Sequence, residues 1–236
     1  MNESFLIKPL KSIGRDVSTS MFTKKFFEQH LPSVRSKEHL HSLVERQVNF
    51  PIIWLDQIHG VKVKKIYEAK SRVIQYTDGL YTQNSNLILA IKTADCLPLI
   101  LSNKEGSEIT ALHVGWRGLY KGIIEKALSF FQCDLKEVTA WLAPCISVEN
   151  YTVGTDVFYS FANADKESIS SFQETGEEEK WFFNLKLESA RKLEQRGIKI
   201  TTNNFCTFKD KEFFYSYRRN GTLGRMVTLV WRNDEK

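Results

Sequence analysis

Two histidines and one cysteine stand at turns between apolar stretches of this 236-residue chain: His59 in QIHG, Cys96 in TADC and His113 in LHVGWRG. Two imidazoles and one thiolate suit zinc, and three protein ligands leave a fourth position for water, as in catalytic zinc sites. The three residues form no compact metal motif, so a hydrogen-bonded or buried structural role for each of them stays open. We predict one metal ion between them.

The local sequence places each of these residues in a turn. Gly60 follows His59 and would allow a tight turn there. Pro98 follows Cys96 and would end any helix, so we expect the thiol in a turn and not in a core. His113 would end a strand just before a helix begins at GWRGL, where backbone N–H groups can bind an anion. A metal beside an anion site is therefore expected.

The elements that position these residues follow from apolar periodicity. Strands are predicted at 52–55, 61–66, 87–91, 99–102, 109–114 and 138–142. Helices are predicted at 37–48, 119–131, 156–162 and 185–195, the last capped by Asn184. Because strict βαβ alternation is absent, we expect an α+β fold, a single layered domain over 1–236 with mixed sheets flanked by helices.

Two further segments have clear local signals. Strands at 213–217 and 226–231 are predicted to form a hairpin joined by Arg218-Arg219-Asn220-Gly221, because Asn-Gly is a hairpin turn signal. The polar, acidic segment 164–180 contains little apolar surface, which predicts a solvated loop.

The composition indicates a globular protein, with 42% hydrophobic and 26% charged residues. The 33 basic and 28 acidic residues give a net charge of +5 and are interspersed, so a nucleic-acid partner is not indicated. The N-terminal MNESFLIKPLKS has no export signal and no apolar run could cross a bilayer, which predicts a cytoplasmic chain without a membrane partner. The four cysteines are then expected as free thiols or ligands.

Six strings carry a family resemblance: WLDQIHG, TDGL, TADCLPLIL, ALHVGWRGL, WLAPCIS and FFYSYRRNGTLGRM. In this order they resemble the family named laccase-domain polyphenol oxidase, multicopper polyphenol oxidoreductase or YfiH-type purine nucleoside phosphorylase. The resemblance runs from about residue 51 to the C-terminus. It implies that His59, Cys96 and His113 bind one zinc ion, and that the fold is cysteine-hydrolase-like and related to a bacterial toxin. One cysteine and two histidines cannot build several copper centres, so copper is disfavoured.

The resemblance also implies an activity on purine nucleosides and phosphate. Adenosine, inosine, guanosine and methylthioadenosine would be split by phosphate into the base and the sugar phosphate, and adenosine would also be deaminated by water. Zinc-bound water would serve the deamination. Phosphate needs cationic donors, so Arg117 joins the three ligands in the predicted catalytic set, with Arg218 and Arg225 as further candidates. For Arg219 we favour a surface role.

Residues near the ligands have two interpretations each. Gln57 and Asp95 could orient a ligand or simply form turns. Trp116, Tyr120 and Tyr217 could stack on a purine or belong to the core. The segment IGRDVSTSMFTKKFFEQH lacks the double glycine usual in the family, which leaves the identity of the nucleoside open.

Two alternative functions use the same residues. With Cys96 as nucleophile and His113 as its general base, the chain would be a metal-free hydrolase or amidase, for example one that edits peptidoglycan precursors. With a fourth ligand, for which Cys145 is the candidate, zinc would be structural and the chain a non-enzymatic binding module. Metal content and the effect of Cys145→Ser distinguish these cases. The oligomeric state is not predicted.

Overall fold

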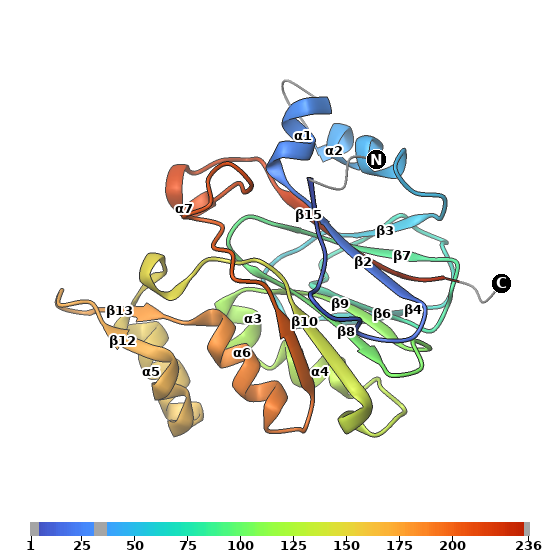
Figure 1. Cartoon of the computed structure of the whole chain (residues 1–236). Coiled ribbons are helices and arrows are strands. Elements are labelled where there is room, and N and C mark those ends of the chain that lie inside the picture. The colour runs from blue at the N-terminus through green and yellow to red at the C-terminus, as the bar shows by residue number, and fades with distance from the viewer. Residues whose placement is uncertain (1–4, 31–36, 234–236) are drawn as a thin grey trace.

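The computed structural model describes residues 5–30 and 37–233, and two six-stranded sheets form its centre (Figure 1). The first sheet contains, in spatial order, β1 (Leu6–Ile7), β2 (Val17–Phe22), β15 (Met226–Arg232), β7 (Ile88–Thr93), β3 (Ile52–Leu55) and β5 (Val73–Ile74). The second contains β14 (Lys199–Thr202), β10 (Val138–Leu142), β8 (Leu97–Asn103), β9 (Ile109–Val114), β6 (Gly79–Thr82) and β4 (Val63–Ile66). Both sheets mix parallel and antiparallel pairs.

Strand β3 shows why the sheets are covered on both faces. Ile53 and Leu55 contribute to the core between the two sheets, whereas Ile52 and Trp54 pack toward the helices outside the first sheet. All four side chains are buried, so the strand appears in the sequence as a continuous apolar run. The two faces of each sheet therefore need separate partners.

Helices supply the outer partners. On the first sheet lie α1 (Lys24–His30) and α2 (Lys37–Glu45), at the top of Figure 1. On the second lie α3 (Trp116–Tyr120), α4 (Ile123–Leu128) and α6 (Leu185–Glu194), at the bottom of the same view. The layers thus run helix, sheet, sheet, helix, which confirms the predicted α+β class with mixed sheets flanked by helices.

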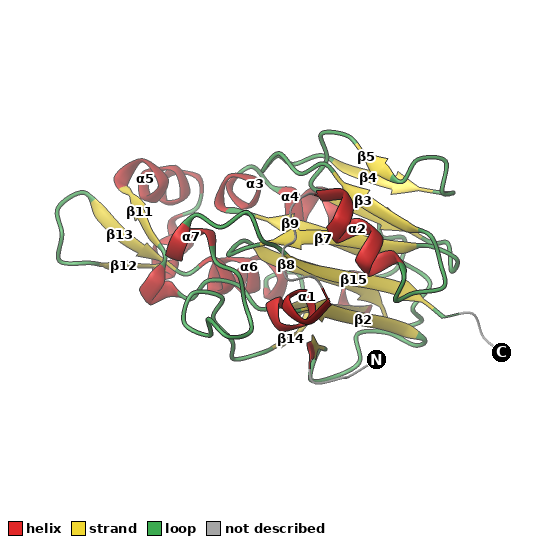
Figure 2. Ribbon diagram, turned by 90° about the horizontal axis from the view of Figure 1, so that it is seen from above, coloured by secondary structure: helices red, strands yellow, loops and turns green. Residues whose placement is uncertain are grey.

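A smaller unit extends from one end of these layers. It consists of the sheet β11 (Thr152–Gly154), β13 (Lys180–Phe183) and β12 (Phe172–Glu174), with α5 (Thr155–Ala164) beside it (Figure 2). The short helices η2 (Leu135–Glu137), η3 (Val148–Asn150) and η4 (Lys166–Ser171) complete the elements. The prediction of a loop over 164–180 is wrong except at Asp165 and 175–179, because Ser168 and Ser171 donate hydrogen bonds to the buried carboxylate of Glu188.

Glycines account for two other differences from the sequence-based expectations. The helix predicted at 119–131 is broken into α3 and α4 by Gly122, whose φ is 88°. The predicted hairpin is wrong, because Tyr217–Asn220 form a helical turn, α7, that ends at Gly221 with a φ of 63°. Strand β15 pairs with β2 and β7 instead. The predicted cap of α6 is confirmed, since Asn184 Oδ1 accepts from Leu187 N at 2.9 Å.

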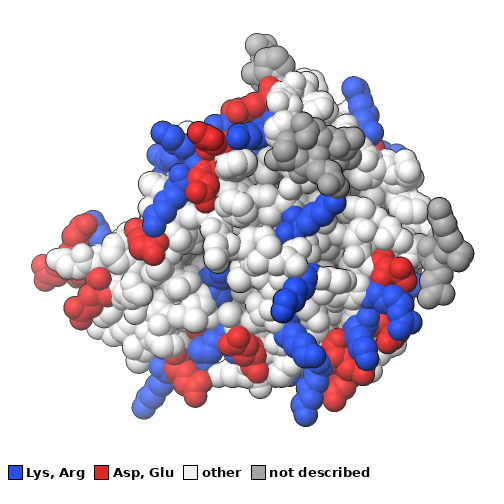
Figure 3. Space-filling view, in the orientation of Figure 1, with Lys and Arg blue, Asp and Glu red and all other residues white. Residues whose placement is uncertain are grey.

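Among the described residues, no helix is long and apolar enough to cross a bilayer. In Figure 3, basic and acidic side chains lie close to one another around the margin of the face shown, and much of its middle is uncharged.

Candidate metal centre

Connections that pass from the first sheet to the second build the site. The β3–β4 connection carries His59, the β5–β6 connection carries Asp78 and the β7–β8 connection carries Cys96. His113 lies in β9, where it pairs with Pro98 at the start of β8. Four residues that are far apart in sequence therefore meet where the chain crosses from the first sheet to the second.

The predicted ligand residues His59, Cys96 and His113 come together. One ligand atom from each lies within 4.8 Å of the others, and they are the only described residues that form such a group. The two imidazole rings are 4.7 Å apart at 77°. His59 is exposed, Cys96 half-buried and His113 buried, so the group lies at the bottom of an opening with one ligand toward solvent.

A residue that sequence reasoning missed holds the imidazole of His113 and the backbone of the His59 turn. Asp78 is fully buried, and its Oδ1 accepts from Nδ1 of His113 at 2.8 Å. The same carboxylate accepts from three successive backbone N–H groups, those of Ile58 (3.2 Å), His59 (2.9 Å) and Gly60 (2.7 Å). The string TDGL contains this aspartate, and a lone acidic residue before a buried strand was the available signal.

The turn at His59 differs from the expected one. The positive φ, 60°, belongs to His59 itself, and Gly60 is not among the glycines with positive φ. A non-glycine residue is held in this region only when its surroundings compensate the strain. The three hydrogen bonds to Asp78 supply that compensation and aim the imidazole of His59 at the group.

Interactions among these side chains shift their pKa values from the ordinary ones. Burial opposes ionisation of Asp78, but hydrogen bonds from His113 and Gly60 lower its pKa below the usual range. Burial would also raise the pKa of Cys96, yet the charge of His113 and hydrogen bonds from both histidines lower it to about 6. Burial would lower the pKa of His113, but the charge of Cys96 and the hydrogen bond to Asp78 raise it to about 9. The side chains thus favour a thiolate at neutral pH.

The donor set fits zinc. The hydrogen bond to Asp78 occupies Nδ1 of His113 and leaves Nε2 for a metal, which is the usual arrangement of a ligating histidine. Gly115 leaves room beside the group, since a Cβ there would lie 3.1 Å from Cδ2 of His59 and 3.3 Å from Sγ of Cys96. The adjacent helix α3 has only five residues, so the expected anion site at its N-terminus has little helix dipole behind it.

A cavity of about 800 Å³ opens over the group. Its wall contains four basic side chains, those of Lys92, Arg117, Arg218 and Arg225. Aromatic side chains from three different segments also line it: Trp116, Tyr151 and Tyr217. Leu40 of α2 contributes as well, whereas no residue of the segment 13–30, which departs from the family pattern, is part of the described cavity wall. Such a volume with a few convergent polar groups is typical of a small-molecule site.

The basic side chains of the wall differ in how they are held. The guanidinium of Arg117 is exposed and stacks 4.5 Å from the Trp116 ring. Nη1 of Arg218 donates to the Thr152 carbonyl at 2.8 Å, and the guanidinium lies 5.2 Å from the Tyr151 ring. Nη1 of Arg225 is engaged by the carbonyls of its own loop.

Four other candidates are held by hydrogen bonds or ring packing within the fold. Arg219 is not on the cavity wall and donates to three backbone carbonyls of the segment before it. Tyr120 also lies outside the wall and packs 5.6 Å from the Phe161 ring. The amide of Gln57 pairs with the backbone of Lys92 in both directions. Asp95, next to Cys96, accepts hydrogen bonds from the C-terminal segment.

Cys145 is not part of the ligand group. The backbone of Cys145 pairs with that of Cys206 in an isolated β-bridge. The Sγ of Cys145 donates to the Ile146 carbonyl at 3.5 Å. Burial raises the pKa of Cys145 to about 12, which opposes the thiolate that a metal needs. The described residues thus offer three ligands and not four.

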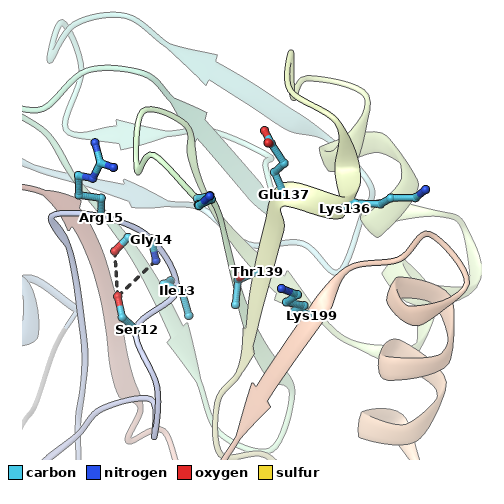
Figure 4. Close-up of a pocket in the computed structure, with 9 residues that line it drawn as sticks. Ser12, Ile13, Gly14, Arg15, Lys136, Glu137, Thr139 and Lys199 are labelled. Carbon is cyan, nitrogen blue, oxygen red and sulfur yellow. Dashed lines mark hydrogen bonds between the residues drawn. The ribbon is translucent and has the colours of Figure 1, made fainter.

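A second hollow, of about 460 Å³, is lined mainly by polar and charged residues. Figure 4 shows Arg15, Lys136 and Lys199 around it, with Glu137 at its rim. Arg15 is paired with Glu105 at 2.9 Å. No histidine or cysteine lines this hollow, so the candidate site is the cavity over His59, Cys96 and His113.

Comparison with known families and proteins agrees with that location. Residues 34–233 match the family model described as multi-copper polyphenol oxidoreductase laccase. The chain is 35% identical over 181 residues to a Haemophilus influenzae protein named purine nucleoside phosphorylase, covering 76% of this chain and 73% of that protein. It is 33% identical over 180 residues to the Escherichia coli purine nucleoside phosphorylase YfiH, with the same two coverages, 76% and 73%.

Solved structures show the same fold. A Neisseria meningitidis protein of the family DUF152 superimposes with a TM-score of 0.89 at 26% identity, covering 98% of this chain and all (100%) of that one. A Bacillus licheniformis hypothetical protein YfiH superimposes with a TM-score of 0.84 at 23% identity, covering 92% and 93% of the two chains.

Proposed function

The chain belongs to the multi-copper polyphenol oxidoreductase laccase family, and we propose that it acts there as a zinc-dependent purine nucleoside phosphorylase. We include in this proposal phosphorolysis of methylthioadenosine and deamination of adenosine. The relatives from Haemophilus influenzae and Escherichia coli bear the name purine nucleoside phosphorylase, which supports a nucleoside and phosphate as substrates. The observation that carries the proposal is the group His59, Cys96 and His113 beneath a cavity with basic and aromatic walls.

The residues of the cavity suit both substrates. Trp116, Tyr151 and Tyr217 offer aromatic faces to a purine. Arg117 and Arg218 offer guanidinium groups, which match the oxygens of phosphate with paired hydrogen bonds. In phosphorolysis a phosphate oxygen forms a bond to the anomeric carbon of ribose while the bond to the purine nitrogen breaks. The electron pair leaves with the purine, which takes up a proton.

The metal would be held by Nε2 of His113, an imidazole nitrogen of His59 and the Cys96 thiolate. Zinc, when bound, lowers the pKa of its water toward ~7 and supplies hydroxide for hydrolytic deamination. Asp78 keeps the proton on Nδ1 of His113 and holds the His59 turn. Zinc is preferred to copper because the described residues form one group with a single thiolate and two imidazoles, and not several centres.

Product analysis tests this function. Purified zinc-loaded protein is incubated with adenosine in the presence and absence of phosphate, and purines and sugars are separated. Adenine that appears only with phosphate supports phosphorolysis, and inosine supports deamination. Protein that forms neither product overturns the proposal. Cys96→Ala serves as the negative control, and Cys133→Ala, which changes a thiol outside the group, serves as the matched control.

A cysteine hydrolase is the second candidate, and one observation favours it. Cys96 and His113 hydrogen-bond to each other, and the charge of His113 lowers the pKa of the thiol to about 6 although burial opposes this. A thiolate beside an imidazolium is the activated pair of cysteine hydrolases. Protein that turns over without stoichiometric metal and is inactivated by alkylation at Cys96 would favour this candidate. This second proposal includes the prediction that the fold is related to that of cysteine hydrolases.

We also propose that residues 1–236 form one domain. One apolar core joins the two large sheets, with Ile53 and Leu89 from the first and Ile100 and Trp141 from the second. Sheets that share their core in this way would unfold together.

A further inference from the structure

We propose that Asp95 is a positioning residue for the phosphate substrate: its carboxylate holds the start of α7 so that the Arg218 guanidinium lies in the cavity wall. This inference rests on the proposed phosphorolysis. It assigns a task to Asp95, the neighbour of the ligand Cys96, through the contacts of its carboxylate with the C-terminal segment.

Asp95 occupies an unusual backbone conformation that its contacts maintain. Its φ is 90°, a region that residues other than glycine rarely adopt. Its carbonyl accepts from Ile146 N at 3.0 Å, and its side chain is 8% exposed. The turn between β7 and β8 is thus held from two directions, through the main chain and through the carboxylate.

The carboxylate of Asp95 accepts hydrogen bonds from three donors in one distant segment. Oδ1 accepts from the Thr207 hydroxyl at 2.7 Å. Oδ2 accepts from the Ser216 hydroxyl at 3.0 Å and from the backbone N–H of Arg218 at 2.7 Å. Thr207 and Ser216 are fully buried, so water cannot replace these bonds without rearrangement.

These contacts cap a helical turn from another part of the chain. In α7 the Ser216 hydroxyl accepts from Arg219 N at 3.2 Å, as an N-cap residue does. The N–H of Arg218, which has no partner within the turn, is taken by Asp95 instead. The backbone of Arg218 is therefore placed by a residue that adjoins the metal ligand Cys96.

The Arg218 side chain is then directed by two further contacts. Nη1 donates to the Thr152 carbonyl at 2.8 Å, and the guanidinium lies 5.2 Å from the Tyr151 ring. Within the described part of the chain, Nη2 of Arg218 has no hydrogen-bond acceptor, although the residue lines the cavity. A guanidinium fixed on one edge and open on the other is arranged to bind an anion. Arg117 is exposed instead, and among the described residues its guanidinium stacks only on the Trp116 ring.

The test removes the carboxylate without adding backbone strain. Asp95→Gly suits this purpose because glycine adopts a φ of 90° at no steric cost. The KM for phosphate should rise about tenfold, the effect expected when Arg218 is displaced and one hydrogen bond from its guanidinium to the charged phosphate is lost. The kcat at saturating phosphate should stay within about threefold of wild type, and bound zinc per chain should be unchanged.

Two variants serve as controls. Asp210→Ala removes another carboxylate of the same segment. This carboxylate accepts a hydrogen bond from Cys206 N at 2.8 Å, and that bond does not involve α7. It should leave the KM for phosphate unchanged. Ser216→Ala removes one donor to Asp95 and should raise the KM in the same direction, which keeps the proposal testable if Asp95→Gly does not fold.

A double-mutant cycle separates positioning from general damage. If Asp95 acts through Arg218, then Asp95→Gly should add nothing to the KM for phosphate in a chain that already carries Arg218→Ala. Additive effects, an unchanged KM in both Asp95→Gly and Ser216→Ala, or a loss of zinc parallel to the rise in KM overturn the proposal. Wild-type protein without phosphate-dependent purine release overturns the proposed function and this inference together, whereas active wild type with an unchanged KM for phosphate in both Asp95→Gly and Ser216→Ala overturns this inference alone.

Discussion

The carboxylate of Asp78 accepts a 2.8 Å hydrogen bond from Nδ1 of His113, and the two side chains are 0% and 4% exposed. One buried carboxylate thereby sets the orientation of one imidazole, and through three backbone N–H groups it also sets the turn that presents His59. Two of the three candidate metal ligands depend on this residue, although it does not itself belong to the ligand group.

Asp78→Asn should weaken zinc binding by about 10- to 100-fold, the usual cost of losing a partner of a ligating histidine. The Asn oxygen can replace either Oδ1, which accepts from His113 and His59 N, or Oδ2, which accepts from Ile58 N and Gly60 N, and the NH₂ group then opposes the two donors on the other side. Competition with a chromophoric chelator measures the affinity. Asp134→Asn, which alters an exposed cap of η2, is the matched control and should bind zinc as wild type does. Equal affinities in the two variants would contradict the role of Asp78.

Zinc removal should expose a reactive thiol at Cys96. Although burial opposes ionisation, the charge of His113 and hydrogen bonds from both histidines lower the pKa of Cys96 to about 6. A lowered thiol pKa means that the thiolate persists above about pH 6 and is lost as the pH falls through that value. In metal-stripped protein the rate of iodoacetamide alkylation at Cys96 should therefore reach half its maximum near pH 6, and added zinc should suppress it.

Cys133 is an internal control for this experiment. Burial and the neighbouring carboxylate of Glu108 raise its pKa to about 11, so its alkylation should remain slow at neutral pH. Peptide mapping follows both thiols in one sample. A midpoint for Cys96 near the ordinary cysteine value of about 8.5 would refute the predicted thiolate.

Arg218 and Arg219 are adjacent but should respond differently to truncation. The Arg219 guanidinium donates to three backbone carbonyls at 2.7 to 2.9 Å, and removal of a charged donor leaves them short of partners. Arg219→Ala should lower the free energy of unfolding by about 2 to 3 kcal/mol. Arg218→Ala removes one exposed bond and should cost less than about 1 kcal/mol. Urea denaturation compares the two, and equal losses would show that Arg219 has no special structural role.

Cys145→Ser should retain bound zinc. The Cys145 thiol contacts the Ile146 carbonyl and lies outside the ligand group, so serine can replace it without removing a ligand. Metal analysis after gel filtration gives the zinc content, with Cys96→Ser as the variant expected to lose it. If Cys145→Ser also loses zinc, the site is closed by a fourth ligand and the zinc is structural.

Much of the fold could be predicted where periodicity is strong. Strands β3, β9 and β10 have the predicted bounds, 52–55, 109–114 and 138–142, because each is buried on both faces and continuous apolar runs mark them. The segment 164–180 was misjudged because its order depends on the carboxylate of Glu188, which no local pattern reveals. The Asn-Gly signal before β15 predicted the turn of a hairpin, and this was wrong, since Gly221 ends a helical turn instead.

The sequence by itself determined the residue types of the site: His59, Cys96 and His113 could be singled out as candidate ligands from their chemistry, their turns and the family resemblance. Only the tertiary structure decided how they are held and what they face. Asp78 and Asp95 act on groups that are 18 to 35 and 112 to 123 positions away, and such pairs form only when the two sheets pack together. Local patterns extend over a few residues, whereas a buried carboxylate takes its partners from whichever elements the fold brings beside it.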